Sequence, residues 1–178
     1  MLFLACAIML QGWTMAQRCQ GKDAVDRIRN GLDMSQATGS RAQEPIFLGL
    51  LAEVLAVTKA TEGGLAVLAE ALALAQSSGA KGNDAELHRL QGDLLGRLPS
   101  AGDKEVEACF HAALAIAREQ GTRGFELRAA VSLARLRRDQ GRRTEARDLL
   151  APVYGWFTEG FDAADLKEAK VLLEALDA

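Results

Sequence analysis

The feature that most constrains this chain is an internal repeat with a period of about forty residues. Four segments share a small or slim residue, a bulky apolar residue four positions later, and a small or apolar residue three positions after that. The matching triplets are Ala24/Ile28/Gly31, Gly64/Leu68/Ala71, Val106/Phe110/Ala113 and Ala146/Leu150/Val153. These offsets place the three residues on one face of a helix, and a fixed period of this length is typical of a helical solenoid.

A second apolar helix is expected upstream of each segment, and each contains a small residue. These small residues are Gly12, Ala52, Gly92 and Ala134. Their spacings of 40, 40 and 42 residues match the downstream spacings of 40, 42 and 40, so the third unit carries two extra residues. We place them in the loop 98–104, which contains Pro and Gly, where an insertion costs little. Each unit is therefore predicted to be a helical hairpin whose small residues let the two helices approach.

Glycines are expected to end the second helices, because glycine adopts the positive φ that a helix C-terminus often needs. They are Gly39, Gly79, Gly121 and Gly160. The abundance of Ala and Leu, with three prolines and 5% aromatic residues, also favours helix over strand. The sequence predicts one domain over residues 1–178, with units at about 2–39, 42–79, 84–121 and 125–160 and a capping helix at 163–177.

The fourth unit resembles the tetratricopeptide repeat. That motif's packing positions hold Ala130, Leu133, Ala134, Gly141, Ala146, Leu150 and Val153, although Arg137 and Val153 replace its usual aromatic and small residues. The period of about forty, against about thirty-four in that motif, implies longer helices. Cys19 stands where the first unit should have its turn glycine. The resemblance implies an all-α, right-handed superhelical array of antiparallel helix pairs, with about four hairpins and a C-terminal capping helix.

The two ends of the array differ. At the C-terminal end, we expect Asp162 to be the N-cap of the capping helix, with Phe161 and Leu166 at hydrophobic-staple spacing. The apolar face of that helix would comprise Leu166, Ala169, Leu172, Leu173 and Leu176. At the other end, the apolar residues Leu2, Phe3, Leu4, Ile8 and Leu10 have neither a cap nor a polar outer face. We expect them to be covered by further repeats of a longer protein or by a second copy of this chain.

The apolar start of the chain lacks the basic lead and cleavage site of a signal peptide, and polar residues arrive at Gln11, far short of a membrane span. We therefore expect a cytoplasmic protein that neither crosses nor binds a membrane. The aromatic cluster at 154–161 is interpreted as packing at the end of the array. Tyr154 and Phe157 would lie on the last second helix, Gly160 would end it, and Trp156 has no assigned face.

No catalytic constellation is visible. His88 and His111 are lone histidines on predicted helices, and Cys6, Cys19 and Cys109 have no C-x-x-C spacing. We interpret Cys109 as a small core residue. The sequence thus predicts neither an enzyme nor a cofactor or metal site, and the net charge of −3 argues against nucleic acid.

Arginine is the one chemical bias. Arg128, Arg135, Arg138 and Arg142 share one side of a predicted helix at about 100° per residue. They could form a solvated face with intrahelical ion pairs. Alternatively, if first helices line the concave groove of the array, they would bind acidic segments of a partner.

A wider resemblance covers essentially the whole chain and is densest over the last ninety residues. The segments 85–92, 113–121, 127–134, 140–143 and 148–170 look like the C-terminal tail of large bacterial regulators, in which a cyclase or DNA-binding domain and a signalling ATPase precede tetratricopeptide-like repeats. This implies a non-catalytic interaction module, the sensor or scaffold tail of a cyclase- or ATPase-type protein, with those domains among its partners. The alternative is a small-ligand or enzymatic pocket inside the superhelix, using His88, His111 or the arginines.

Overall fold

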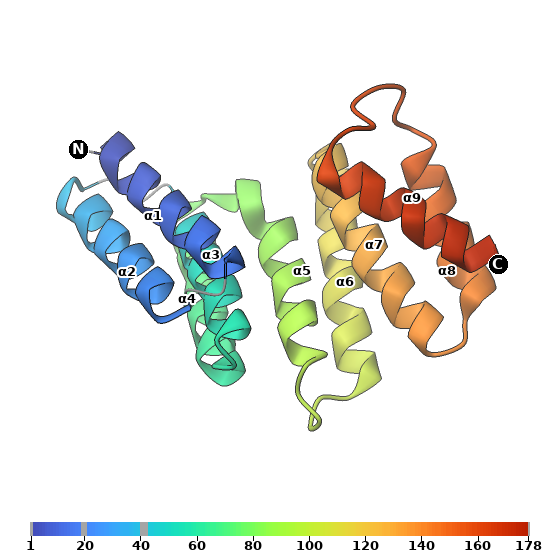
Figure 1. The fold of residues 1–178 in the computed structure, drawn as a ribbon, viewed down its shortest axis with the longest axis horizontal. Coiled ribbons are helices and arrows are strands. Elements are labelled where there is room, and N and C mark those ends of the chain that lie inside the picture. The colour runs from blue at the N-terminus through green and yellow to red at the C-terminus, as the bar shows by residue number, and fades with distance from the viewer. Residues whose placement is uncertain (1, 19–20, 40–42, 178) are drawn as a thin grey trace.

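The computed structural model describes residues 2–18, 21–39 and 43–177, and within these ranges the chain is helical and has no strand (Figure 1). The helices are α1 (Leu2–Gln17), α2 (Gly21–Ala37), α3 (Glu44–Val57), α4 (Thr61–Ser78), the short 3₁₀ helix η1 (Lys81–Asn83), α5 (Asp84–Leu95), α6 (Asp103–Glu119), α7 (Arg123–Asp139), α8 (Arg143–Tyr154) and α9 (Ala164–Asp177).

Consecutive helices pack as the pairs α1–α2, α3–α4, α5–α6 and α7–α8, and α9 packs against α7 and α8 (Figure 1). The first helices of successive pairs also contact one another, α1 with α3, α3 with α5 and α5 with α7. Contacts among first helices place them on the inner side of the array, as expected for a solenoid whose concave surface they form.

The positions that repeat in the sequence are the positions through which the two helices of each pair pack. All twelve residues of the four triplets, and the small residues Gly12, Ala52, Gly92 and Ala134, are buried. A Cβ at Gly12 would lie 2.7 Å from Ile28 Cγ1, and one at Gly92 would lie 2.6 Å from Phe110 Cε1. The bulky residue of each triplet therefore fills the space that a side chain on the facing helix would need.

The hydrophobic core forms two clusters along the array. The first is built from α1 to α5 and contains fully buried side chains such as Ile28 and Leu68. The second is built from α6 to α9 and contains Leu133 and Leu150. Gly92 against Phe110 joins α5 to α6 at the boundary between them.

Three of the four expected glycines act as predicted at the ends of second helices. Gly39, Gly79 and Gly121 have φ values of 74°, 73° and 66°, in the left-handed region. The fourth prediction is wrong, because α8 ends at Tyr154, so Phe157 and Gly160 lie outside it. Pro152 cannot donate a helical hydrogen bond and glycine at 155 is a poor helix former, which together account for the early end. Cys19 lies outside the described residues.

The capping helix begins at Ala164, and the carbonyl of Ala163 accepts the N–H of Lys167. Ala163 therefore precedes the helix where Asp162 was expected as N-cap, and that prediction is wrong by one residue. The predicted apolar face is otherwise inward: Leu166, Ala169, Leu172 and Leu176 are buried and Leu173 is half-buried. The ring of Phe161 lies 6.0 Å from that of Tyr154.

The first helix has an exposed apolar side. Phe3 is 89% exposed, and Leu4 and Leu10 are each more than half exposed, whereas Ile8 is half-buried. Met9 and Ala5 of the same helix are fully buried against the α2 side. Among the helices of the described residues, none combines the length and apolar content that crossing a bilayer requires.

Candidate docking groove

Two adjoining cavities follow the inner side of the array, one of about 200 Å³ and the other of about 280 Å³. They share Glu53, Leu90, Arg128 and Asp165, so they form one groove that runs across α1, α3, α5, α7 and the start of α9. We call this surface the docking groove, its larger part the apolar cavity and its smaller part the polar cavity. The apolar cavity is lined mostly by apolar side chains and the polar cavity mostly by charged ones.

The apolar cavity lies toward the N-terminal end of the groove. Its apolar lining consists of Trp13, Ile46, Gly49, Leu50, Leu87, Leu90 and Phe125. A Cβ at Gly49 would lie 3.0 Å from Leu87 Cδ2, so this glycine lets α3 and α5 meet closely beneath the cavity. Trp13 Nε1 donates a hydrogen bond of 2.7 Å to Glu53 Oε2, which fixes the indole of α1 against the carboxylate of α3.

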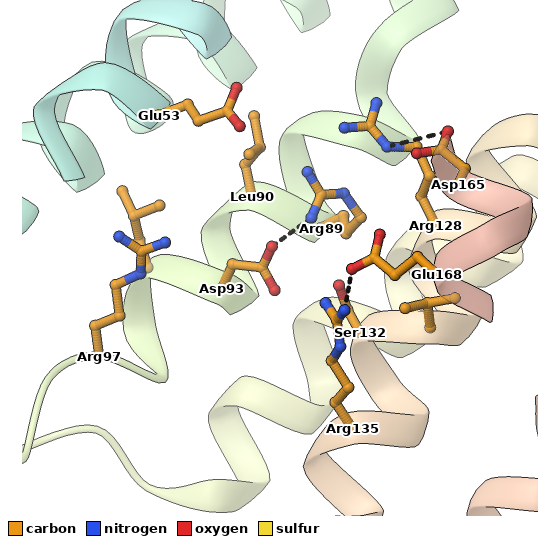
Figure 2. A pocket seen from close by; sticks show the side chains of 12 residues that line it. Glu53, Arg89, Leu90, Asp93, Arg97, Arg128, Ser132, Arg135, Asp165 and Glu168 are labelled. Atoms are coloured by element: carbon orange, nitrogen blue, oxygen red, sulfur yellow. Dashed lines mark hydrogen bonds and ion pairs between the residues drawn. The ribbon is translucent and has the colours of Figure 1, made fainter. Parts of the chain in front are cut away.

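The polar cavity is organised around a buried arginine (Figure 2). Arg89 of α5 is 8% exposed, and its Nε and Nη2 donate to the two carboxylate oxygens of Glu86 at 2.9 and 2.7 Å. Its Nη1 donates to Asp93. Burial works to lower the pKa of Arg89, but its bonds to Glu86 and the charges of Glu86 and Asp93 outweigh it and raise the pKa. This guanidinium is therefore permanently charged and fixed in place.

Asp93 carries the perturbed carboxyl group of this cavity. Burial raises the pKa of Asp93 above its ordinary value of 3.8, although the charge of Arg89 and a hydrogen bond from Ser132 oppose the rise. A raised carboxyl pKa in a cleft can mark an acid–base residue, but the geometry here is that of an ion-pair network. Its partners are on the neighbouring turns of α5 and on α7, which points to a structural role.

The predicted arginine stripe is only partly a groove feature. Arg128 and Arg135 of α7 line the polar cavity, and Figure 2 shows both pointing to carboxylates of α9. Arg128 lies 3.0 Å from Glu86 Oε1 and 3.9 Å from Asp165 Oδ2, and Arg135 is paired with Glu168. Much of the positive charge that the sequence indicated is thus neutralised within the chain.

The other two arginines of the stripe lie elsewhere. Arg138 is on α7 beyond the polar cavity and pairs with Asp139 at 2.9 Å. The placement of Arg142 on the same helix is wrong, because α7 ends at Asp139 and Arg142 is the N-cap of α8. There it pairs with Glu107 at 3.1 Å and with Glu145 at 2.7 Å, tying α6 to α8.

One groove position recurs in every unit and was not recognised in the sequence. The residue directly after each small inner-helix residue lines the groove: Trp13, Glu53, Asp93 and Arg135. Because Gly12, Ala52, Gly92 and Ala134 face their hairpin partners, the next residue is rotated by about 100°, toward the concave side. This rule would have identified the groove from the repeat alone.

The other candidate residues lie outside the groove. His88 and His111 line neither cavity, and His111 Nε2 is 3.6 Å from Glu107 Oε1 on its own helix. Cys109 is half-buried, and burial together with the charge of Glu105 raises the pKa of its thiol. In the described part of the chain, no group of three or more His, Cys, Asp or Glu side chains is placed to hold a metal ion.

Trp156, whose face the sequence left unassigned, lies in the loop between α8 and α9 and is 56% exposed. The guanidinium of Arg123 lies over its ring at 4.7 Å from the centroid, a cation–π distance. Phe157 packs edge-on at 5.5 Å. These contacts attach the loop to the start of α7.

Comparison with known proteins gives the fold. The crystal structure described as a Podosopora anserina kinesin light chain with nearly identical TPR-like repeats superposes with a TM-score of 0.70 at 14% identity, covering 99% of this chain and 86% of that one. A second crystal structure of that protein gives 0.66 at 14% identity, covering 96% and 92%. No family model matches the chain.

Among curated proteins, this chain is similar to an uncharacterized protein of Rhizobium meliloti (strain 1021), with 30% identity over 132 residues. The match covers 73% of this chain but only 12% of that protein. This chain therefore corresponds to a small part of a much longer relative.

The expected fold class is confirmed: the chain is an all-α, right-handed array of antiparallel helix pairs of the tetratricopeptide-like type with a C-terminal capping helix.

Proposed function

We propose that this chain is a non-catalytic protein-interaction module that binds a segment of a partner protein in the docking groove. The observation that carries the proposal is the groove itself, which crosses four inner helices and joins an apolar cavity to a polar one. An apolar and a polar cavity in line along one concave surface can accept the side chains of an extended or helical segment with alternating apolar and polar residues.

The arginine stripe enters this proposal in a changed form. Arg128 and Arg135 keep their role as candidate partner contacts, with Arg138 beyond them. An acidic segment would have to replace Asp165 at Arg128, which also pairs with Glu86, and Glu168 at Arg135. Such an exchange is favourable only if the released carboxylates of Asp165 and Glu168, whose side chains are about half exposed, remain in water. Arg142 is proposed only as a secondary contact, because it lies outside both cavities.

We further propose that the module is the sensor or scaffold tail of a larger cyclase- or ATPase-type signalling protein in the cytoplasm. The much greater length of the Rhizobium meliloti relative supports a place inside a multidomain protein. In this role, a segment bound in the groove would shift the conformation of attached or partner ATPase or cyclase domains.

The exposed face of α1 is proposed as a contact for a second copy of the chain or for preceding repeats. Phe3, Leu4 and Leu10 are too exposed and too apolar for an isolated surface. We expect sedimentation velocity to show concentration-dependent self-association that Phe3→Asp with Leu10→Asp removes. A wild-type monomer over the whole concentration range would count against the second copy.

The groove proposal is tested by selecting binders from a display library of random 12-residue peptides. Selected peptides should bind the wild-type chain, and Leu50→Lys, which puts a charge into the apolar cavity, should weaken them at least tenfold. Ala66→Lys, an exposed position on α4, is the matched control and should bind like wild type. Equal binding by both variants would place the peptides outside the groove and contradict the proposal.

The alternative of a small-ligand pocket is favoured by one observation, the apolar cavity of about 280 Å³. It predicts that small molecules bind there by themselves, so a small-molecule thermal-shift screen should yield stabilisers of the wild-type chain that do not stabilise Leu50→Lys. Neither histidine lines this cavity, so an enzymatic version would have to use its carboxylates or arginines.

A further inference from the structure

Glu53 is the carboxylate of the docking groove that makes no ion pair within 4.0 Å among the described residues. Within the described residues, no arginine, lysine or histidine nitrogen lies within 4.0 Å of it, although it lines both cavities. The other groove carboxylates are paired: Glu86 with Arg89 and Arg128, Asp93 with Arg89, Asp165 with Arg128, and Glu168 with Arg135. Figure 2 shows Glu53 extending from α3 toward Leu90 and Arg89 of α5.

A hydrogen bond from the indole of Trp13 holds this carboxylate in place. Trp13 Nε1 donates to its Oε2 at 2.7 Å, while Oε1 has no hydrogen-bond partner among the described residues. Glu53 is half-buried, so part of its hydration has been removed, and the charge that acts on it is that of Arg89, more than 4.0 Å away. A cation placed at Oε1 would recover that free energy, because a charge-assisted hydrogen bond is stronger in a partly desolvated site.

The surroundings define the shape of the cation's carrier. Beside Glu53 the cavity is lined by Ile46, Leu50, Leu90 and Phe125, and the indole of Trp13 forms one wall. Apolar walls accept a side chain of their own kind, and an indole face attracts a guanidinium or ammonium group. The pairing of an apolar cavity with an unpaired carboxylate is complementary to an amphipathic, basic segment.

We propose that Glu53, Trp13 and the apolar cavity form a subsite for a basic side chain next to an apolar one, in a peptide segment of the partner protein. This inference rests on the proposed function and adds the chemistry of the ligand at the N-terminal end of the groove. It commits to positive charge beside Glu53, whereas Arg135 of α7 lines only the polar cavity and Arg128, which lines both cavities, is already paired with Glu86 and Asp165. The charges along the groove would therefore favour one orientation of a bound segment as well as one composition.

The test uses the peptides selected from the 12-residue library, with Kd measured by fluorescence anisotropy on the full chain. We expect enrichment of Arg or Lys next to a large apolar residue, and Glu53→Gln should weaken such peptides about tenfold. Gln keeps an oxygen that can accept the Trp13 hydrogen bond, so the change removes charge with little loss of shape. Glu62→Gln, an exposed carboxylate on α4, is the control and should leave Kd unchanged.

A double-mutant cycle makes the assignment specific. Replacing the basic residue of a selected peptide with Gln should cost wild type about tenfold in Kd and cost Glu53→Gln almost nothing. Trp13→Phe provides a second variant that keeps the carboxylate, and it should weaken binding less than tenfold. Unchanged melting temperatures would verify that the variants are folded.

Three results would overturn the inference. One is the selection of peptides enriched in acidic rather than basic residues. Another is that replacing the peptide's basic residue with Gln weakens binding equally for wild type and for Glu53→Gln. The third is saturation by arginine amide at the same concentration as the peptides, which would identify a free small cation as the ligand. If Leu50→Lys has no effect, the proposed groove function fails; if Leu50→Lys abolishes binding and Glu53→Gln does not, only this subsite fails.

Discussion

Lys59 holds a backbone conformation that normally belongs to glycine. Its φ is 64°, and it follows Ala52 by seven residues, as Gly141, with φ of 78°, follows Ala134. Both end an inner helix, with Lys59 N–H donating to Ala56 O and Gly141 N–H to Arg138 O. Equivalent positions in two units therefore carry a glycine, which adopts the left-handed region without strain, and a lysine, which does not.

Replacing Lys59 with glycine should stabilise the chain. We expect Lys59→Gly to raise the free energy of unfolding by about 0.5–1 kcal/mol, because the strain of a side chain at positive φ is removed. Gly141→Ala should lower it by about 1 kcal/mol. Urea denaturation followed by circular dichroism measures both. Lys59→Ala controls for loss of the lysine chain, and a stability loss in Lys59→Gly would show that the position is unstrained.

Glu126 makes stability depend on pH. It is 5% exposed and accepts hydrogen bonds from Arg118 at 2.8 Å and Arg123 at 2.7 Å. Burial works to raise the pKa of Glu126, but the two arginines outweigh it and hold the pKa below its ordinary value of 4.5. A carboxyl group with a lowered folded-state pKa stabilises the fold above its unfolded value, and this stability is lost as pH falls through the folded-state pKa.

We therefore expect Glu126→Gln to lower the free energy of unfolding at pH 7 by about 1–3 kcal/mol. The difference from wild type should shrink as pH falls below the ordinary carboxyl pKa of 4.5 and through the lowered folded-state pKa of Glu126, because wild-type Glu126 then becomes protonated as well. Urea titrations at a series of pH values measure it. Glu119→Gln, an exposed carboxylate near the end of α6, should follow the wild-type curve. A difference that stays constant with pH would contradict the assignment.

At the scale of elements, close approach within a hairpin depends on missing side chains. A Cβ at Gly92 of α5 would lie 2.6 Å from Phe110 Cε1 and 2.9 Å from Cδ1, inside van der Waals contact with a rigid ring. Gly92→Ala should therefore lower the free energy of unfolding by about 1–3 kcal/mol. Phe110→Leu should cost less in that background than in wild type, because the smaller side chain relieves the overlap.

Gly63 is the matched control for this prediction. It lies in α4 with no atom within 4 Å of an added Cβ, so Gly63→Ala should raise stability by up to about 1 kcal/mol. Thermal and urea unfolding of the two alanine variants give the comparison. Stabilisation by Gly92→Ala would mean that α5 and α6 do not pack through this contact.

Which helices pair could be predicted from the sequence, because the repeat determines it. Where the helices end and which residues form ion pairs could not be predicted. The anchors Ile28, Leu68, Phe110 and Leu150 are all buried as their spacing indicated. Helix ends depend on single residues such as Pro152, which the periodicity of the apolar positions does not register. The partners of Arg135 and Arg128 are 33 and 42 residues away, so only the folded array brings Glu168 and Glu86 to them.

At the scale of the whole molecule, the two hydrophobic clusters predict regional stability. In a solenoid each unit contacts only its neighbours, so damage in one unit spreads weakly. Leu133→Ala should raise hydrogen exchange in α6 to α9 much more than in α2 to α4, and Leu68→Ala should do the reverse. Mass spectrometry of exchange in peptic fragments measures both. Uniform acceleration along the chain in either variant would show one cooperative unit.

The central claim is that the inner face of the array binds a partner segment. It is tested most directly by ¹⁵N-labelled NMR titration of the full chain with a selected peptide. A peptide bound in the groove should shift signals of the residues of α1, α3, α5 and α7 that line it, with the indole N–H of Trp13 among them. Shifts confined to α2, α4, α6 and α8, or to the loop around Trp156, with the Trp13 signal unmoved, would contradict it.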